Sequence, residues 1–178
     1  GLIWEHELFW LSYHPEYRGL LLGLTAGWPH ADPTQFEASN LINWLRGNYE
    51  IEQIQVLLEQ TRNDLGLVDF MAQLASTLYP RDEDIRNAIN RGHEIGSHGH
   101  HHYPRRSLSE EMFEQELHIS AGIIESILNQ RSNSFAYPYS EFLPGDTAIC
   151  ARYFDQVATV EGKLISKGYN PLHMPRCT

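Results

Sequence analysis

The segment at residues 92–104 constrains this chain more than any other; it reads Gly-His-Glu-Ile-Gly-Ser-His-Gly-His-His-His-Tyr-Pro. Two of its histidines, His98 and His102, are four residues apart. On one helical turn that spacing puts both imidazoles on the same face, where each can reach one metal ion at about 2.0–2.1 Å. Imidazole nitrogens suit divalent ions such as Zn²⁺. The segment therefore predicts a metal site, the alternative being a histidine-rich surface loop that binds metal only adventitiously.

Helix and strand patterns alternate around this segment, over residues 80–178. Asp82 is placed to cap a helix that Gly92 ends, and Ser109 is placed to cap a second helix. This alternation is typical of an α/β layer with parallel strands, so the fold class we expect is α/β. The short strands that we expect lie at 93–97, 134–137 and 156–160, with a helix near 147–152 between the last two.

Residues 1–79 have a different pattern, in which apolar side chains recur at helical spacing. The clearest case is Ile51, Ile54 and Leu58, which predict an amphipathic helix up to about Arg62. Pro15 restricts the residue before it and is expected to end the first helix. We expect further helices up to Gly47 and over 68–78, and thus a helical region at 1–79 that precedes an α/β region at 80–178.

Composition excludes several classes of partner. The net charge is −10, from 13 basic and 23 acidic residues, whereas nucleic acids and anionic membranes are bound by clustered Lys and Arg. No run of about 18 apolar residues is present, so the sequence predicts no transmembrane segment. The two cysteines, Cys150 and Cys177, define neither a disulfide framework nor a zinc site.

Three blocks of sequence, in the same order, resemble the polysaccharide deacetylase family. These enzymes are metal-dependent carbohydrate esterases that remove N- or O-acetyl groups from glycans. The first block, 92–102, is similar to the family's Gly-His-Glu-Ile-Gly-x-His-x-x-x-His segment, and the second resembles its aromatic-Pro-Tyr-Gly strand end. The second block is 135–140, and the third runs over 154–160 and on to 174–176.

The resemblance implies a fold, a function and a site. The region at 80–178 would be the central part of a distorted (β/α) barrel, and 1–79 a helical insertion in that catalytic domain. His98 and His102 would bind the divalent metal, and the backbone N–H of Tyr139 would help to stabilise the oxyanion. Arg176 would orient a carboxylate base, unless it is an ordinary surface arginine. The substrate would be an acetylated carbohydrate, and the family slightly favours the cell envelope or another extracytoplasmic compartment.

The chain also departs from the family pattern. It has no Thr-Phe-Asp-Asp segment, which supplies the base and the third metal ligand, and no late apolar-strand histidine, which supplies the general acid. Ala136 stands where many relatives have Arg, and Ser140 where they have Gly. The alternatives to a deacetylase are a degenerate carbohydrate-binding or scaffold domain, and a metal-binding module without sugar specificity. If other residues act as the base, the first to consider are Glu94, Glu141 and Asp155.

The remaining histidines are expected to play lesser parts. His100 and His101 point off other faces of the turn, and His93 is expected to be a satisfied strand histidine. His118 is expected to face solvent. Because the carboxyl ends of parallel strands meet at one edge of a sheet, Tyr139 should lie close to the metal-binding pair, with its side chain partly exposed there for a sugar ring to pack on.

Overall fold

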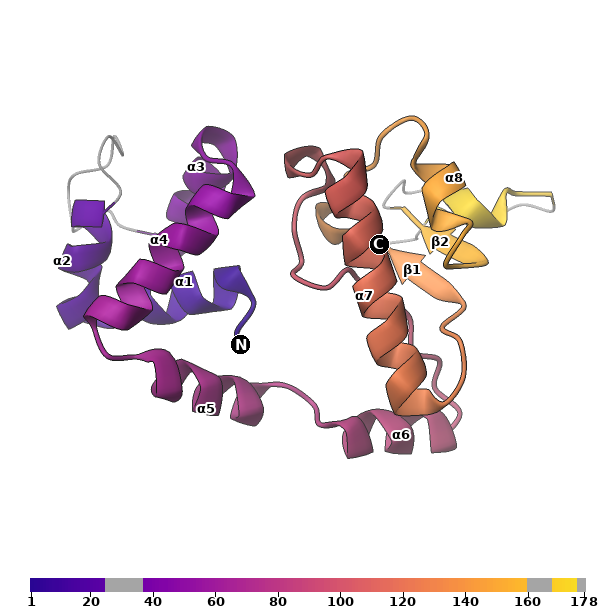
Figure 1. The fold of residues 1–178 in the computed structure, drawn as a ribbon, viewed down its shortest axis with the longest axis horizontal. Coiled ribbons are helices and arrows are strands. Elements are labelled where there is room, and N and C mark those ends of the chain that lie inside the picture. The colour runs from indigo at the N-terminus through magenta and orange to yellow at the C-terminus, as the bar shows by residue number, and fades with distance from the viewer. Residues whose placement is uncertain (25–36, 160–167, 176–178) are drawn as a thin grey trace. The chain divides into compact units, whose positions relative to one another are not determined.

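The fold is given by a computed structural model, which describes residues 1–24, 37–159 and 168–175 (Figure 1). The chain divides into two compact units, Gly1–Tyr79 and Pro80–Thr178. Within the described part of the chain, no helix is both long enough and apolar enough to cross a membrane.

The first unit is helical, as its sequence pattern predicts. Pro15 differs from expectation: it does end the first helix, but it is also the first residue of the next one. Proline fits a first helical position because the N–H that it lacks has no partner inside the helix there. The helices are α1 (Trp4–Tyr13), α2 (Pro15–Leu24), α3 (Ala38–Asn48), α4 (Ile51–Asp64) and α5 (Val68–Leu78).

The core of the first unit consists of leucines and isoleucines from α1 to α4. Leu8, Leu41 and Leu45 are completely buried, and Ile54 and Leu58 of α4 are nearly so. The carboxylate of Glu7 lies in this core and accepts a hydrogen bond from Arg62 Nη1 at 2.6 Å. Burial raises the pKa of Glu7, although the Arg62 guanidinium acts in the opposite direction.

The second unit combines helices with a small parallel sheet. Ser109 caps α7 as expected, since its side chain accepts a hydrogen bond from the backbone N–H of Met112. Gly92, with φ of +89°, follows the end of the preceding helix in the left-handed region that glycine tolerates. The elements are α6 (Asp82–Asn90), η2 (Arg105–Ser107), α7 (Glu110–Leu128), β1 (Ser134–Ala136), η3 (Pro138–Ser140), α8 (Asp146–Cys150), β2 (Gln156–Ala158) and η4 (Pro171–His173).

The sheet is smaller than the sequence predicts. The strands β1 and β2 pair in parallel, with Phe135 opposite Val157. The strand expected at 93–97 is wrong except at its last residue, Ser97, which forms a single parallel bridge to Phe135. A second single bridge joins Ala158 to Met174. Over the part of the chain that the structure describes, most elements are helices, the sheet has two parallel strands, and a barrel is not seen.

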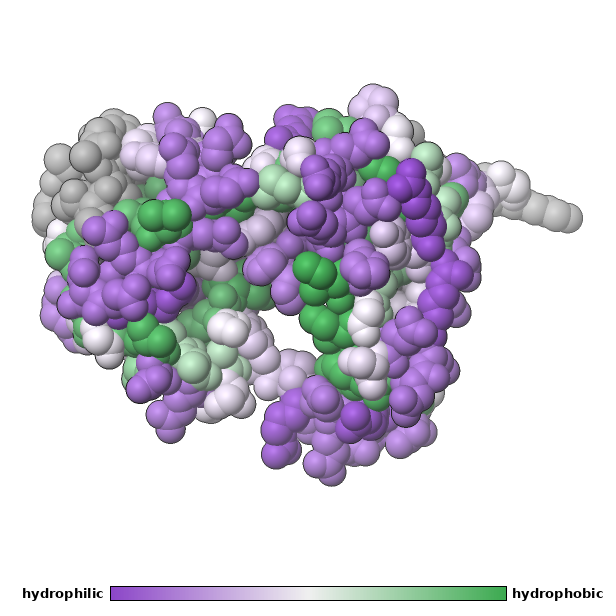
Figure 2. Space-filling model, viewed as in Figure 1, coloured by the Kyte–Doolittle hydropathy of each residue, from purple (hydrophilic) through white to green (hydrophobic). Residues whose placement is uncertain are grey.

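The two faces of the sheet have different environments. Phe135 points to the core, where its ring lies 5.4 Å from that of Phe154 and 6.3 Å from that of Phe113 on α7 (centroid distances). Alternation along the strand turns Ser134 and Ala136 to the opposite face. Polar residues cover most of the visible surface of the unit, with patches of apolar side chains among them (Figure 2).

Cys150 is part of the core behind the sheet. It is fully buried, and its Sγ lies 3.3 Å from the Tyr137 hydroxyl. Burial raises the pKa of the Cys150 thiol to about 11, although the Tyr137 hydroxyl lowers it somewhat. Cys177 lies outside the described residues.

A buried ion pair ties the segment after the histidines to α8. Arg105 Nη2 and Asp146 Oδ1 are 2.9 Å apart, and both side chains are about 95% buried. Arg105 also donates to the Leu108 carbonyl, and Asp146 accepts from the backbone N–H of Leu143, so each charge has further partners. The guanidinium stacks on Phe113, 4.4 Å from the ring centroid. Sequence patterns did not reveal this pair because its members are 41 residues apart.

Removal of one member of this pair should be costly. We expect Asp146→Ala to lower the free energy of unfolding by about 3–5 kcal/mol, because it leaves the Arg105 charge buried without its counter-ion. The control is Asp155→Ala, which breaks the exposed pair of Asp155 and Arg131 (3.6 Å) and should cost less than about 1 kcal/mol. Urea denaturation measures both values. Equal losses in the two variants would contradict the role given to the buried pair.

Candidate functional site

His98 and His102 lie side by side at the end of the strand-like segment that contains Ser97. Their ring centroids are 4.9 Å apart, with 62° between the ring planes. The backbone brings them together through a tight turn rather than a helix, since Gly99 has a φ of +85° and His102 a φ of +62°. The four-residue spacing thus pairs the two imidazoles, but by a different backbone conformation from the one the spacing alone suggests.

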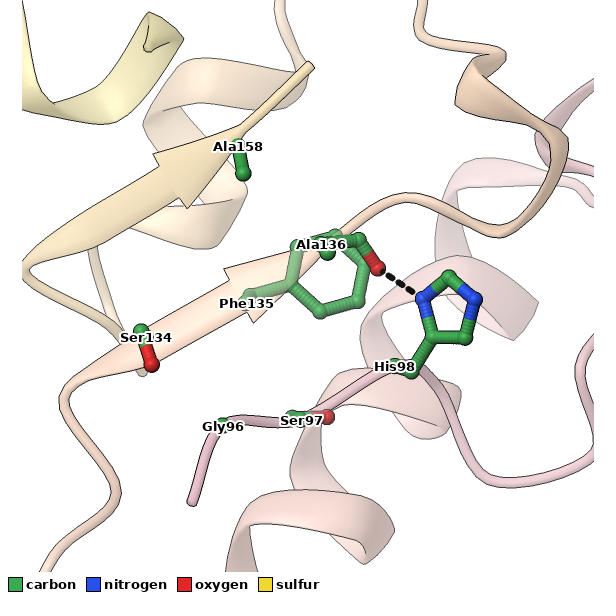
Figure 3. Close-up of a pocket in the computed structure, with 7 residues that line it drawn as sticks. All are labelled: Gly96, Ser97, His98, Ser134, Phe135, Ala136 and Ala158. Atoms are coloured by element: carbon green, nitrogen blue, oxygen red, sulfur yellow. Dashed lines mark hydrogen bonds between the residues drawn. The ribbon is translucent and has the colours of Figure 1, made fainter. Parts of the chain in front are cut away.

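The orientation of His98 is set by the neighbouring strand. Its Nδ1 lies 2.7 Å from the Ala136 carbonyl oxygen at the end of β1 (Figure 3). Because a carbonyl only accepts, Nδ1 carries the proton and the lone pair of the neutral ring is on Nε2. Metal-binding histidines are commonly oriented by such a hydrogen bond from their second nitrogen. The orienting group here is backbone, so it does not depend on the Ala136 side chain, which stands where many relatives have Arg.

An open groove of about 280 Å³ borders His98 on the face of the sheet opposite the aromatic core (Figure 3). Small residues line most of it. A close approach favours glycine at position 96, because a Cβ there would lie 2.5 Å from Ser134 Oγ and 3.1 Å from the Ser134 carbonyl oxygen. The lining residues are Gly96, Ser97, His98, Ser134, Phe135, Ala136 and Ala158.

Tyr139 lies beside the histidine pair. Its ring centroid is 4.9 Å from that of His102, and its side chain is partly exposed. Tyr139 follows β1 and His98 follows the bridge at Ser97, so the two belong to the same edge of the sheet, as parallel pairing predicts. The structure therefore brings His98, His102 and Tyr139 together. The role of Tyr139 in stabilising an oxyanion stays a prediction.

The neighbouring histidines of the turn contact a carboxylate that sequence analysis missed. Glu116 on α7 accepts hydrogen bonds from the backbone N–H groups of His100 (2.9 Å) and His101 (2.8 Å), and from His101 Nδ1 (2.5 Å). Burial would raise the pKa of Glu116, but these three hydrogen bonds outweigh it and the pKa is lowered. The available signal was an acidic residue next to the apolar Leu117, in the helix that Ser109 caps.

The other candidates lie elsewhere. No group of three His, Cys, Asp or Glu side chains that could hold a metal occurs among the residues that the structure describes. Glu94 is exposed, as is Asp155, and the Glu141 carboxylate lies 3.4 Å from the backbone N of Arg106. His93 is exposed and lies outside any strand, so its expected place in a strand was wrong. Arg176 lies outside the described residues.

Comparison with protein families identifies the class to which this arrangement belongs. The model of the polysaccharide deacetylase family matches residues 54–152, more than half of the chain. The chain therefore belongs to the polysaccharide deacetylase family. The match begins in α4 of the first unit and continues through α8, so it is not confined to the second unit. No curated protein matches the chain.

Two solved structures are similar to part of the chain. One is a polysaccharide deacetylase from Bacillus cereus, with 21% identity and a TM-score of 0.48 over 53% of this chain and 31% of that one. The other is a proposed polysaccharide deacetylase from Bacillus anthracis, with 25% identity, a TM-score of 0.48 and the same two coverages of 53% and 31%. The chain thus spans about a third of the length of these structures.

The departure at Ser140 has a measurable consequence. Its φ is +62°, a left-handed conformation that costs a residue with a Cβ about 1–2 kcal/mol. Glycine avoids this cost but loses about 0.5–1 kcal/mol through the greater freedom of the unfolded chain. We therefore expect Ser140→Gly to raise the free energy of unfolding by roughly 0.5–1 kcal/mol.

The matched control is Ser140→Ala, which keeps the Cβ and should give no gain. Urea denaturation of both variants separates backbone strain from the loss of the hydroxyl. An equal gain in both variants would show that strain at this position is not the cause.

Proposed function

We propose that this chain provides the metal-binding histidine pair of a deacetylase that removes acetyl groups from an N-acetylated polysaccharide or glycan. One observation carries the proposal: the His98 and His102 rings lie 4.9 Å apart, and the Ala136 carbonyl orients His98. Membership of the polysaccharide deacetylase family supports hydrolytic chemistry on an acylated carbohydrate. The metal, the substrate and the activity of the whole protein belong to the proposal.

Two histidines would supply part of the ligand set of a divalent metal. His98 would bind through Nε2 and His102 through a ring nitrogen, with Zn²⁺ as the commonest ion for such ligands. Structural and catalytic zinc sites usually have at least three protein ligands, so we infer that a further ligand comes from beyond the described residues. The metal, when bound, polarises the acyl oxygen and activates water for hydrolysis.

Tyr139 would act on the substrate side of the pair. Its backbone N–H would donate to the oxyanion that develops as the acyl carbon is attacked, and such donors are among the largest contributions to hydrolysis. Its partly exposed ring, beside His102, would offer a surface on which a sugar ring can pack. Arg176 remains our candidate for orienting a carboxylate base.

The rest of the catalytic machinery would complete a distorted (β/α) barrel around the sheet described here. The open groove beside His98 supports this, because the sheet face lined by Gly96, Ser134 and Ala136 is left open by the other described elements of the second unit. Its small side chains leave space for further elements at close distance. The region at 1–79 would then be a helical insertion in that domain.

One observation favours a second function, that of a non-catalytic relative. The described residues offer no third metal ligand beside the histidine pair. A chain that retained the histidine turn and lost its carboxylates would act as a carbohydrate-binding or scaffold domain. Acetate release that depends on His98, in the second experiment below, would exclude this function.

The first experiment measures metal binding by the full chain. We expect wild-type protein to bind Zn²⁺ in equilibrium dialysis against a weak chelator, and His98→Ala to abolish binding, because one histidine holds the ion too weakly. The control is His118→Ala, because the His118 ring is exposed on α7 and contacts the Tyr153 ring edge-on, with 5.9 Å between centroids. Unchanged Zn²⁺ stoichiometry in His98→Ala would overturn the assignment of the pair as ligands.

The second experiment measures activity. A general acid and a general base each contribute about 10²–10⁴-fold to such reactions, so we expect the 178-residue chain alone to release acetate from chitin oligomers at close to the background rate. A matched His98→Ala sample should release acetate at the same rate. Robust release that depends on His98 would show that other residues act as acid and base. Variants at Glu94, Glu141 and Asp155 would then identify the base.

A further inference from the structure

Glu116 is a charged residue in the buried stripe of α7. Only 7% of the residue is exposed, and its neighbours Phe113 and Leu117 on the same helix belong to the core. A buried carboxylate is costly unless hydrogen bonds compensate for the lost water. The local chain does not require an acid here, because leucine or alanine would suit this face of the helix at least as well. The compensation must therefore come from the contacts of the carboxylate.

Those contacts all go to the histidine turn. Oε2 accepts from the backbone N–H groups of His100 and His101, and Oε1 accepts from the His101 side chain. Successive backbone N–H groups that converge on one point form a concave site for an anion. Hydrogen bonds to an ionised acceptor are also roughly twice as strong as neutral ones. Glu116 thus supplies the anion that this turn conformation requires.

A second side chain of α7 holds the beginning of the same turn. Ser120, one helical turn after Glu116, lies 2.7 Å from Ser97 through the two hydroxyl oxygens. Ser97 Oγ in turn accepts from the backbone N–H of Gly99 at 3.3 Å. The backbone N–H groups of Gly99, His100 and His101 are therefore all bonded to side-chain oxygens, two of them directly to α7.

The conformation so held is the one that pairs the metal-binding histidines. His102 has a φ of +62°, which is unfavourable for a residue with a Cβ and persists only where its surroundings enforce it. The bonds to Glu116 fix the two residues immediately before His102. His98, at the other end of the turn, is held separately by the Ala136 carbonyl. Loss of the carboxylate would release His102 while His98 stays in place.

We propose that Glu116 is a positioning residue, which holds the histidine turn so that His102 faces His98. It acts through its hydrogen bonds to His100 and His101. The consequence for metal binding rests on the proposed function, whereas the consequence for the turn does not. The test therefore measures the two separately.

The test compares Glu116→Ala with wild-type protein in the full chain. In metal-free protein, amide hydrogen exchange at His100 and His101 should become roughly 10–100-fold faster, because each N–H loses a charged acceptor. Exchange at Ser97 and Ala136, whose N–H groups bond within the sheet, should not change. The affinity for Zn²⁺, measured by competition with a chromophoric chelator, should fall about 10–100-fold, the usual effect of losing a group that orients metal ligands.

The matched control is Glu114→Gln, two residues away on the same helix. Glu114 is paired with Arg152 at 2.7 Å on the surface of the helix, so its variant should leave both readouts at wild-type values. Should Glu116→Ala fail to fold, Glu116→Gln replaces it. The neutral amide is a weaker acceptor than a carboxylate, and we expect it to accelerate exchange at His100 and His101 by about 3–10-fold.

The outcomes distinguish the two proposals. Wild-type exchange rates at His100 and His101 in the Glu116 variant would overturn the positioning role. Wild-type Zn²⁺ affinity in that variant, with wild-type protein binding the ion, would also overturn it and would leave the proposed function intact. Faster exchange in a protein whose wild type binds no Zn²⁺ would support the positioning role and overturn the metal site.

Discussion

The contact between α7 and β1 determines where the parts of the candidate site lie in the second unit. Phe113 on the helix packs against Phe135 on the strand, and Phe154 stacks on the other side of Phe135. Because this apolar contact sets the height and rotation of the helix, it also sets where the polar residues of the same face emerge. Glu116 and Ser120 are thereby placed under the histidine turn, on a helix whose position is decided by burial of aromatic rings.

The two faces of the sheet also have different roles: one packs in the core and the other borders the candidate site. Phe135 anchors β1 in the core. On the opposite face, the small side chains of Ser134 and Ala136 leave an open groove beside His98. The backbone of the strand also takes part, since the Ala136 carbonyl orients His98. Tyr139 follows shortly after the end of the strand. A site assembled from carbonyl groups and turns tolerates side-chain changes that a site made of side chains would not. The departure at Ala136 is compatible with the geometry for this reason.

Much of the local structure could be predicted from sequence. The spacing of Ile51, Ile54 and Leu58 predicts α4. Ser109 caps α7, and Gly92 follows α6 in the left-handed conformation that glycine tolerates. These signals come from residues that are close in sequence, so the local structure they predict does not depend on the tertiary contacts. The strand expected at 93–97 failed because a strand is defined by its partners, and in the described structure only Ser97 pairs with a neighbour. A barrel is a still more collective property, since its closure requires every strand to have a partner on both sides.

The sequence by itself determined the kinds of element, the family and the identity of the histidine pair, because each of these depends on residues close together in the chain. Only the tertiary structure showed which carbonyl orients His98 and which carboxylate holds the turn. Glu116 lies 15 residues from His101, and Arg105 lies 41 residues from Asp146. Partners at such separations meet only after helices and strands have packed. Until then, an acid on a helix gives no sign of whether it faces solvent or supports a site.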